Sequence, residues 1–515
     1  MKKTKLFSLM LAGVMLLTAC GSGDVASSGS QGEAQGSEEK AYKDTLVVAL
    51  ASEPQNLDPT ISTNAVNRQA EVNIFNTLVD LTPEGEIVPE LATKWEQIDN
   101  YTIRFYLRDD VYFHNGEKLT AEDVKFSLHR LTAMGVNTSM YTAFDTENTE
   151  VVDELTIDVK MKEPFAAAYN FLAAPYAGIH CKKYVEEVGD DHVVRNPVGT
   201  GPFKLIEWRA GDALELERFD DYWGEKPTYS HLTMRFISEG TTRTIELETG
   251  GVDVIYNVPI ADLERLKEND ELNVIIGPGR RYTYCTINMK DPTFADERVR
   301  EAILCALDME TIVENVYGDM ATVADSIINP RIIGYHSMGV VEYNPERAKE
   351  LLKEAGAENL SFTLKMNDDS TFIACAEIMA NMWKQVGITC DVQVLEMATY
   401  TDQGARGEVQ IGISSYSTAS GDADQALQTW KTTYNGQIQG NDPKIDELLL
   451  KARQEWDYDQ RMADYAEAIE YMWNTHYMIP IAFNNLAFAT GDNVEGLECH
   501  PGEVPDLAKV VIYEK

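Results

Sequence analysis

Strand-like and helix-like stretches follow one another along most of this chain, and their order limits the folds it can adopt. A continuous apolar run at 46–50 suits a strand buried on both faces. Apolar and polar residues alternate as in half-buried strands at 103–107, 155–161 and 213–219, and further strands are predicted at 479–483 and 509–513. Helical spacing begins after four residues of types that cap helices: Thr120, Asp296, Asn344 and Asp442. Because the two patterns alternate without a short internal repeat, the sequence predicts an α/β fold.

The first twenty residues have a different character. Lys2, Lys3 and Lys5 make the start cationic, and 6–17 is an almost unbroken apolar run. That run is shorter than the roughly 20 apolar residues that a membrane-spanning helix needs. A charged start, a short apolar middle and small residues at the cleavage point are the parts of an export signal. We therefore expect the folded protein to lie outside the cytoplasm.

The small pair Thr18-Ala19 is followed by Cys20, and this ending resembles the lipobox of bacterial lipoproteins. In such proteins the cysteine carries lipid and becomes the new N-terminus; the alternative is an ordinary secretory signal with a chance cysteine. Residues 21–40 are almost devoid of apolar side chains, which is typical of a flexible tether. We expect a signal peptide at 1–19, a tether at 20–43, and lipid anchoring at Cys20 on the extracytoplasmic side of the cell membrane.

The composition excludes several classes of protein. The formal charge of −40 becomes −43 once residues 1–19, with three lysines and no acids, are removed. Such a balance argues against nucleic acid as a partner. About 470 residues remain after the tether, which exceeds one ordinary hydrophobic core and predicts two or three lobes. The six cysteines beyond Cys20 have no C-x-x-C spacing, and the eight histidines have no metal-binding spacing. No metal site, cofactor or disulfide pairing is predicted.

The sequence also lacks the short motifs that carry common hydrolytic or phosphate chemistry. It contains no G-x-S-x-G elbow, no H-E-x-x-H and no Gly-rich phosphate loop. Acidic pairs such as Asp109-Asp110 are expected by chance among 84 acids and suit solvated turns. These absences argue against a secreted hydrolase, and no catalytic residue is predicted.

Several strings occur in one order over some 400 residues: 91–128, 198–205 (VGTGPFKL), 248–254 (ETGGVDV), 294–308, 343–356 and 442–461. With these strings the chain resembles the extracytoplasmic solute-binding proteins of peptide-type ABC importers, a family with oligopeptide-, dipeptide-, glutathione- and nickel-binding members. The resemblance implies a periplasmic-binding-protein-like α/β fold, in which two hinged lobes enclose a cleft and a third lobe is inserted. It places lobe I at 44–80, 196–276 and 484–515, lobe II at 81–195 and lobe III at 277–483. A monomer is expected.

The resemblance also points to the stretch 414–430 (SSYSTASGDADQALQTW) as a wall of the cleft. Gly421-Asp422-Ala423-Asp424 resembles the Gly-Asp-Pro-Asp of relatives, which implies that Asp422 pairs with the α-ammonium of the ligand. A charge-assisted bond of this kind is short and strong in a closed cleft. The alternative is that Asp422 or Asp424 caps the helix that starts near Gln425, and Asp424 is the better candidate for the cap.

Further ligand contacts are expected from three places. Tyr416, Ser420 and Gly421 belong to the same loop, although Tyr416 also suits a core aromatic. Thr63, Asn64 and Asn67 lie in the polar, breaker-rich stretch 53–67, before helical spacing returns at 70–81, and solvated loop residues have the same pattern. Arg280 and Arg281 lie at the expected crossing into lobe III and could hold a carboxylate in a bidentate fashion, or form a surface ion pair.

One departure from dipeptide-binding relatives affects the expected ligand. These carry an arginine for the C-terminal carboxylate on the helix after the strand near Leu364, whereas 370–379 (STFIACAEIM) has no basic residue here. The amine half of a dipeptide site is therefore predicted and the carboxylate half is not. The leading hypothesis is capture of a peptide-like solute for an ABC permease. Alternatives are a nickel chelate, another amine-bearing solute, or a surface receptor that senses a solute.

Overall fold

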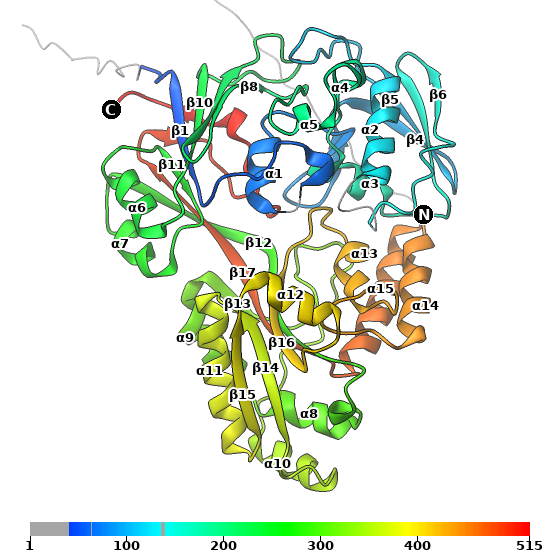
Figure 1. Ribbon diagram of the computed structural model, residues 1–515, viewed down its shortest axis with the longest axis vertical. Helices are drawn as coiled ribbons and strands as arrows, with labels where there is room; N and C mark the ends of the chain where they lie inside the picture. Colours follow the sequence, from blue (N-terminus) through cyan, green and yellow to red (C-terminus); the bar gives the residue numbers. More distant parts are fainter. Residues whose placement is uncertain (1–40, 63, 135–139) are drawn as a thin grey trace, which may run out of the picture. The chain divides into compact units, whose positions relative to one another are not determined.

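One mixed sheet runs through the described part of the protein, which is residues 41–62, 64–134 and 140–515 of a computed structural model (Figure 1). Its strand order is β15-β14-β16-β12-β17-β11-β1-β10-β9-β8, with β13 beside β17. The bounds in this order are β15 (Thr389–Leu395), β14 (Ser361–Asn367), β16 (Ile411–Tyr416), β12 (Leu272–Ile287), β17 (Met478–Gly491), β11 (Val254–Tyr256), β1 (Thr45–Leu50), β10 (His231–Phe236), β9 (Ala213–Arg218), β8 (Phe203–Arg209) and β13 (Ala321–Val323). Parallel and antiparallel pairs both occur, as in β1 with β10 and β10 with β9.

A smaller antiparallel sheet has the order β4 (Ala92–Asp99), β5 (Thr102–Leu107), β7 (Thr156–Lys160) and β6 (Glu150–Asp153). Two short pairs join β2 (Val79–Leu81) to β3 (Ile87–Pro89) and β18 (Val494–Glu495) to β19 (Val511–Ile512). The helices are α1 (Ala65–Glu71), α2 (Ala121–Ala133), α3 (Ala168–Leu172), α4 (Lys182–Val188), α5 (Asp190–Val193), α6 (Gly240–Glu248), α7 (Leu263–Lys267), α8 (Glu297–Cys305), α9 (Met309–Tyr317), α10 (Pro345–Glu354), α11 (Ser370–Gln385), α12 (Met397–Ala405), α13 (Ala423–Ala426), α14 (Pro443–Gln454) and α15 (Tyr458–Trp473). The α/β prediction is confirmed.

Two long strands connect the two halves of the large sheet. Figure 1 shows β12 and β17 side by side, running from the strands around β1 to those around β14. At one end of this pair β17 is hydrogen-bonded to β11, and at the other end β12 is hydrogen-bonded to β16. The strand predicted at 479–483 is therefore only the first part of β17. The prediction ends at Phe483 because the residues after it do not alternate regularly between apolar and polar.

Local rules account for the helix starts. Thr120 and Asp123 form the capping box of α2, and Asn344 caps α10 through Arg347 N. The helical spacing predicted at 70–81 is wrong: α1 covers Ala65–Glu71, and Val79–Leu81 is strand β2. Asn64 caps α1 with its side chain and so starts the helix within the stretch predicted to be a loop.

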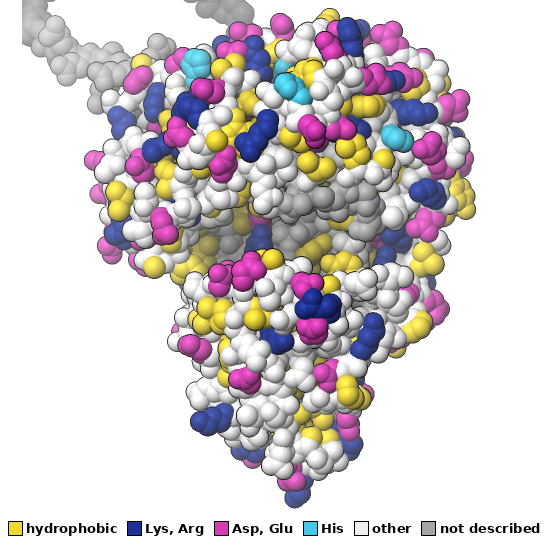
Figure 2. Space-filling view, in the orientation of Figure 1, with side chains coloured by type: hydrophobic (Ala, Val, Ile, Leu, Met, Phe, Trp, Pro, Cys, Tyr) yellow, Lys and Arg dark blue, Asp and Glu magenta, His cyan; other side chains and the backbone are white. Residues whose placement is uncertain are grey.

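The buried apolar residues form several separate clusters. One surrounds Phe105 on β5, another Leu364 on β14, and a third Val48 on β1. On the face in Figure 2, acidic and basic side chains are interspersed, and neither sign gathers into one patch. No helix among the described residues is long and apolar enough to cross a membrane. The six cysteines from Cys181 to Cys499 are all free thiols.

Candidate functional site

The predicted cleft stretch, 414–430, starts in the last three residues of β16, which ends at Tyr416, and leads through a loop into α13. Gly421 has φ +66°, a left-handed conformation that favours glycine. Its carbonyl accepts from Ile333 N at 2.8 Å, and Ala423 N donates back to Ile333 O at 2.9 Å. The loop is therefore held on both sides of Asp422 by the segment that contains Ile333.

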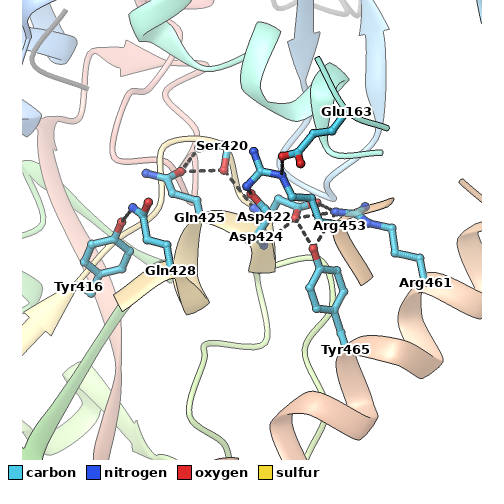
Figure 3. Close-up of polar contacts among 10 residues, drawn as sticks. All are labelled: Glu163, Tyr416, Ser420, Asp422, Asp424, Gln425, Gln428, Arg453, Arg461 and Tyr465. Carbon is cyan, nitrogen blue, oxygen red and sulfur yellow. Dashed lines mark hydrogen bonds and ion pairs between the residues drawn. The ribbon is translucent and has the colours of Figure 1, made fainter. Parts of the chain in front are cut away.

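Asp422 is 0 % exposed, and its charge is already paired within the protein (Figure 3). Its side chain accepts from Asp424 N at 2.8 Å, so Asp422 is the N-cap of α13, and the assignment of the cap to Asp424 is wrong. Both of its carboxylate oxygens lie 2.7 Å from Nη2 of Arg461 on α15, and Tyr465 Oη donates to Oδ1 at 3.4 Å. Burial by itself would lower the pKa of Arg461, but the Asp422 charge raises it above its ordinary value.

Asp424 takes part in a second buried pair. Its Oδ2 lies 3.2 Å from Nη1 of Arg453 on α14, and Arg453 Nε lies 3.1 Å from Glu163. Figure 3 shows the two arginines approaching the start of α13 together. The two aspartates of the Gly-Asp-Ala-Asp sequence therefore tie α13 to α14, to α15 and to the segment of Glu163. The contact of Asp422 with a ligand ammonium stays a prediction, and in this geometry its carboxylate has no uncompensated charge.

Two other residues of this stretch, Tyr416 and Ser420, are hydrogen-bonded to the helical segment that follows the loop. Ser420 Oγ donates to Gln425 Oε1 at 2.7 Å, and the Ser420 carbonyl accepts from Asn170 at 3.3 Å. Tyr416 Oη accepts from Gln428 Nε2 at 3.4 Å. Burial raises the pKa of Tyr416 to about 12, so its hydroxyl stays protonated. Ser420 is buried and Tyr416 half-buried, and Figure 3 shows Gln425 and Gln428 between them.

Arg280 and Arg281 lie in an interruption of the β12–β17 ladder. Pairing stops at Pro278 with Asn485 and resumes at Tyr282 with Phe483, so three residues of β12 stand opposite one of β17. Extra residues of this kind bend a strand and redirect side chains. Arg281, 38 % exposed, donates from Nε and Nη2 to Glu503 at 3.1 Å and from Nη1 to Ser415 Oγ at 3.2 Å.

Arg280 does not join Arg281 at Glu503; it lines a cavity and is only 2 % exposed. Burial lowers its pKa to about 10, and Asp80 and Glu503 act on it only at a distance. It lines a cavity of about 480 Å³ together with Arg68, Glu71, Trp223, Ala419 and His500. This volume lies within the range of roughly 300–1,000 Å³ that is typical of small-molecule sites. Of the two arginines predicted from the sequence, Arg280 is the one in this cavity.

The residues predicted near the first strand have structural roles. Asn64 is the cap of α1 and accepts from Asn67 N at 2.9 Å. Asn67 is fully buried, and its Oδ1 accepts from Gln55 N at 2.9 Å. Neither lines the 480 Å³ cavity. Thr63 and Cys20 lie outside the described residues, and contact of a ligand with Thr63, Asn64 or Asn67 stays a prediction.

Residues 86–437 match the model of bacterial extracellular solute-binding proteins, family 5, middle region. The chain belongs to this family. Over 479 residues it is 27 % identical to the glutathione-binding protein GsiB of Salmonella paratyphi A, covering 90 % of this chain and 93 % of that one. The periplasmic binding protein DppA of Helicobacter pylori, in complex with the peptide STSA, matches with 25 % identity and a TM-score of 0.80, covering 93 % and 99 %.

A solved structure of NikA from Staphylococcus aureus with Ni(L-His)₂ also matches, with a TM-score of 0.77, 23 % identity, and coverage of 91 % and 100 %. At that identity the match shows the fold alone. Family membership confirms the predicted periplasmic-binding-protein-like fold. The protein is an extracytoplasmic solute-binding protein of the peptide-type ABC transporter group, and this family binds its solutes rather than converting them.

Sequence reasoning missed the residues that hold the site together. Arg461 and Arg453 lie on helices that follow the loop by some thirty to forty positions, and nothing in their surroundings marks them as partners of Asp422 and Asp424. Glu503 is buried, adopts φ +69°, and pairs with Arg281. A non-glycine residue in this conformation is uncommon and is often functional, but the conformation cannot be detected from sequence.

Proposed function

We propose that the protein captures a peptide-like solute, such as a dipeptide, an oligopeptide or a glutathione-like molecule, and delivers it to an ABC permease for import. The observation that carries this proposal is the cavity of about 480 Å³ with Arg280 and Arg68 in its wall. Peptide-like molecules bring several polar groups and a charge at each end, and a cavity with fixed charges can orient them. The names of GsiB and of the DppA complex favour the same class of solute.

Capture would involve closure of two lobes. We propose lobe I at 44–80, 196–276 and 484–515, lobe II at 81–195 and lobe III at 277–483. The limits between lobes I and III fall near the interrupted pairing of β12 with β17, between Pro278 and Tyr282. A few residues at the end of a regular element can absorb a hinge rotation. A solute that contacts both lobes would favour the closed state by the contacts that it gains there.

We also propose that a lipid on Cys20 holds the protein at the membrane. The reason is the sequence of Thr18-Ala19-Cys20 after a short apolar run. Cells given an alkyne-tagged fatty acid should label the wild-type protein and not the Cys20→Ala variant. Equal labelling of both would contradict lipid attachment at this residue.

The binding proposal is tested with the full-length chain by thermal unfolding, alone and with di- to pentapeptides, glutathione or nickel-histidine. A solute at 100 times its dissociation constant adds about 2.7 kcal/mol of stability, which is readily visible. Peptides or glutathione should raise the melting temperature, and loss of the gene should abolish uptake of the same solute. A shift with nickel-histidine alone would contradict the peptide proposal. Binding without any loss of uptake on deletion would contradict delivery to a permease.

A further inference from the structure

We propose that Arg280 recognises a carboxylate of the solute, so that this protein selects peptide-like solutes by a free carboxylate rather than by a free amine. The inference rests on the proposed function and specifies its ligand. It reverses the expectation from the sequence, in which Asp422 would hold an amine and the carboxylate would have no partner.

The first support is that the Arg280 guanidinium has no partner in the described part of the chain. No carboxylate there lies within ion-pair distance, and Nε has no hydrogen-bond partner. The other buried arginines near the site are all engaged: Arg461 with Asp422, Arg453 with Asp424, and Arg68 with Tyr176 Oη at 3.0 Å. A buried cation without a partner is costly, so this arrangement favours a bound anion.

The second support is the shape of the wall around the guanidinium. A Cβ at Gly421 would lie 2.9 Å from Arg280 Cζ, and one at Gly502 would lie 3.3 Å from Nη1. The Arg280 backbone is held as well, because its N–H donates to Pro501 O at 3.0 Å. Two glycines thus leave the space that the planar group occupies, and a fixed guanidinium suits bidentate binding of a carboxylate.

The third support is the charge balance around Arg280. Arg68, Arg280 and Arg281 face two nearby acids, Glu503 and Asp80, and Glu503 already pairs with Arg281 and lies 3.9 Å from Arg68. Burial raises the pKa of Glu71 and of Glu90 to about 8, so at neutral pH these two carboxyls of the wall are mainly uncharged. The inner wall is therefore cationic, whereas the exposed acids Glu225, Glu498 and Asp506 lie toward solvent.

His500 does not compete for the anion. Its Nδ1 accepts from Gly502 N at 3.1 Å, which leaves Nε2 to donate to Leu81 O at 3.2 Å. Burial and the charge of Arg280 both lower the pKa of His500, so the ring is neutral. Arg280 is left as the cation of this part of the wall.

The test uses the full-length chain and three forms of one equimolar tripeptide library: free termini, N-acetylated, and C-amidated. Isothermal titration and thermal unfolding report binding. The free and N-acetylated libraries should bind alike, and amidation should weaken binding by about 100-fold, as expected when one partner of a buried charge pair is lost. Equal binding of the amidated library, or loss of binding on N-acetylation, would overturn the inference and leave the proposed function intact. If none of the three libraries binds, and dipeptides, tetrapeptides, pentapeptides and glutathione do not bind either, both the inference and the proposed function are overturned.

A substitution separates recognition from a structural role. Arg280→Met keeps an unbranched side chain as far as the position of Nε and removes the unpaired charge, so the ligand-free melting temperature should stay the same or rise. Binding of the free and N-acetylated libraries should fall by about 100-fold. The control is Arg406→Met, which makes the same substitution at an exposed arginine. This variant should bind as the wild type does. A lower ligand-free melting temperature with unchanged binding would assign Arg280 to the scaffold and overturn the inference.

Discussion

The start of α13 and the interruption in β12 both carry buried charges, but within the described part of the chain only the charges at the start of α13 are neutralised. At the start of α13, Asp422 and Asp424 each have an arginine at 2.7 and 3.2 Å. In β12, Arg280 is equally buried and has neither an ion pair nor a hydrogen-bond partner for Nε among the described residues. A paired buried charge belongs to the scaffold, whereas an unpaired one at a cavity is stabilised when a ligand arrives. This difference is the physical basis for our proposal that Arg280, rather than Asp422, contacts the ligand.

The largest expected effect on stability is at the start of α13, where the buried charges are paired. Arg461→Met removes the partner of Asp422 and leaves a carboxylate that is 0 % exposed. Breaking a buried pair in this way costs about 3–5 kcal/mol. Urea unfolding of the variant should show a loss of that size.

The double variant Arg461→Met/Asp422→Asn provides the control. It removes both charges and retains a side chain that can cap α13, so it should recover much of the lost stability. If Arg461→Met is as stable as the wild type, the pair contributes nothing to the scaffold. The role of Asp422 in binding an amine would then regain support.

The next largest effect on stability concerns Glu71, which lines the same cavity as Arg280. The pKa of Glu71 is raised to about 8, mainly by burial; the charge of Asp58 also raises it, whereas the Ser62 hydroxyl and the charge of Arg68 lower it. In the unfolded chain a glutamate titrates near 4.3. Between these values the folded state binds more protons than the unfolded state, so the stability that this group contributes falls as pH rises from about 4.5 to 8.

Glu71→Gln tests this directly. The stability of the wild type relative to the variant should fall by about 2 kcal/mol between pH 5 and pH 7, measured by urea unfolding at each pH. The comparison cancels other titrating groups, including the buried His114. A constant difference between the two proteins would mean that Glu71 is charged at neutral pH. The wall near Arg280 would then be less cationic than we infer.

The fold was predictable where its causes are local. Caps such as Thr120 and Asn344 act within one turn of a helix, and the alternation at 103–107 follows from a strand with one buried face. The prediction failed at 70–81 because apolar residues at helical spacing there belong to a turn and to β2. Periodicity alone does not distinguish these cases over such a short distance.

The site was less predictable because its decisive contacts are distant in sequence. Arg461 follows Asp422 by 39 positions, and Arg281 meets Glu503 across 222 positions. A carboxylate paired internally and one that faces a ligand have the same local sequence. Likewise, Arg280 and Arg281 are adjacent and chemically identical, and only the extra residues of β12 turn one into the cavity and the other toward Glu503.

The smallest expected effect comes from a pair that resembles the first in chemistry and differs only in exposure. Arg406 contacts Asp402 and lies 2.8 Å from Glu408, but its side chain is 51 % exposed. In water the Coulombic gain is small, and the ordering of long side chains offsets it. Arg406→Gln should therefore leave the urea midpoint unchanged within measurement error and bind solute as the wild type does. A clear loss of stability would mean that contact with an acid, rather than burial of the pair, determines what an arginine contributes here, and the contrast between Arg461 and Arg280 would lose its physical basis.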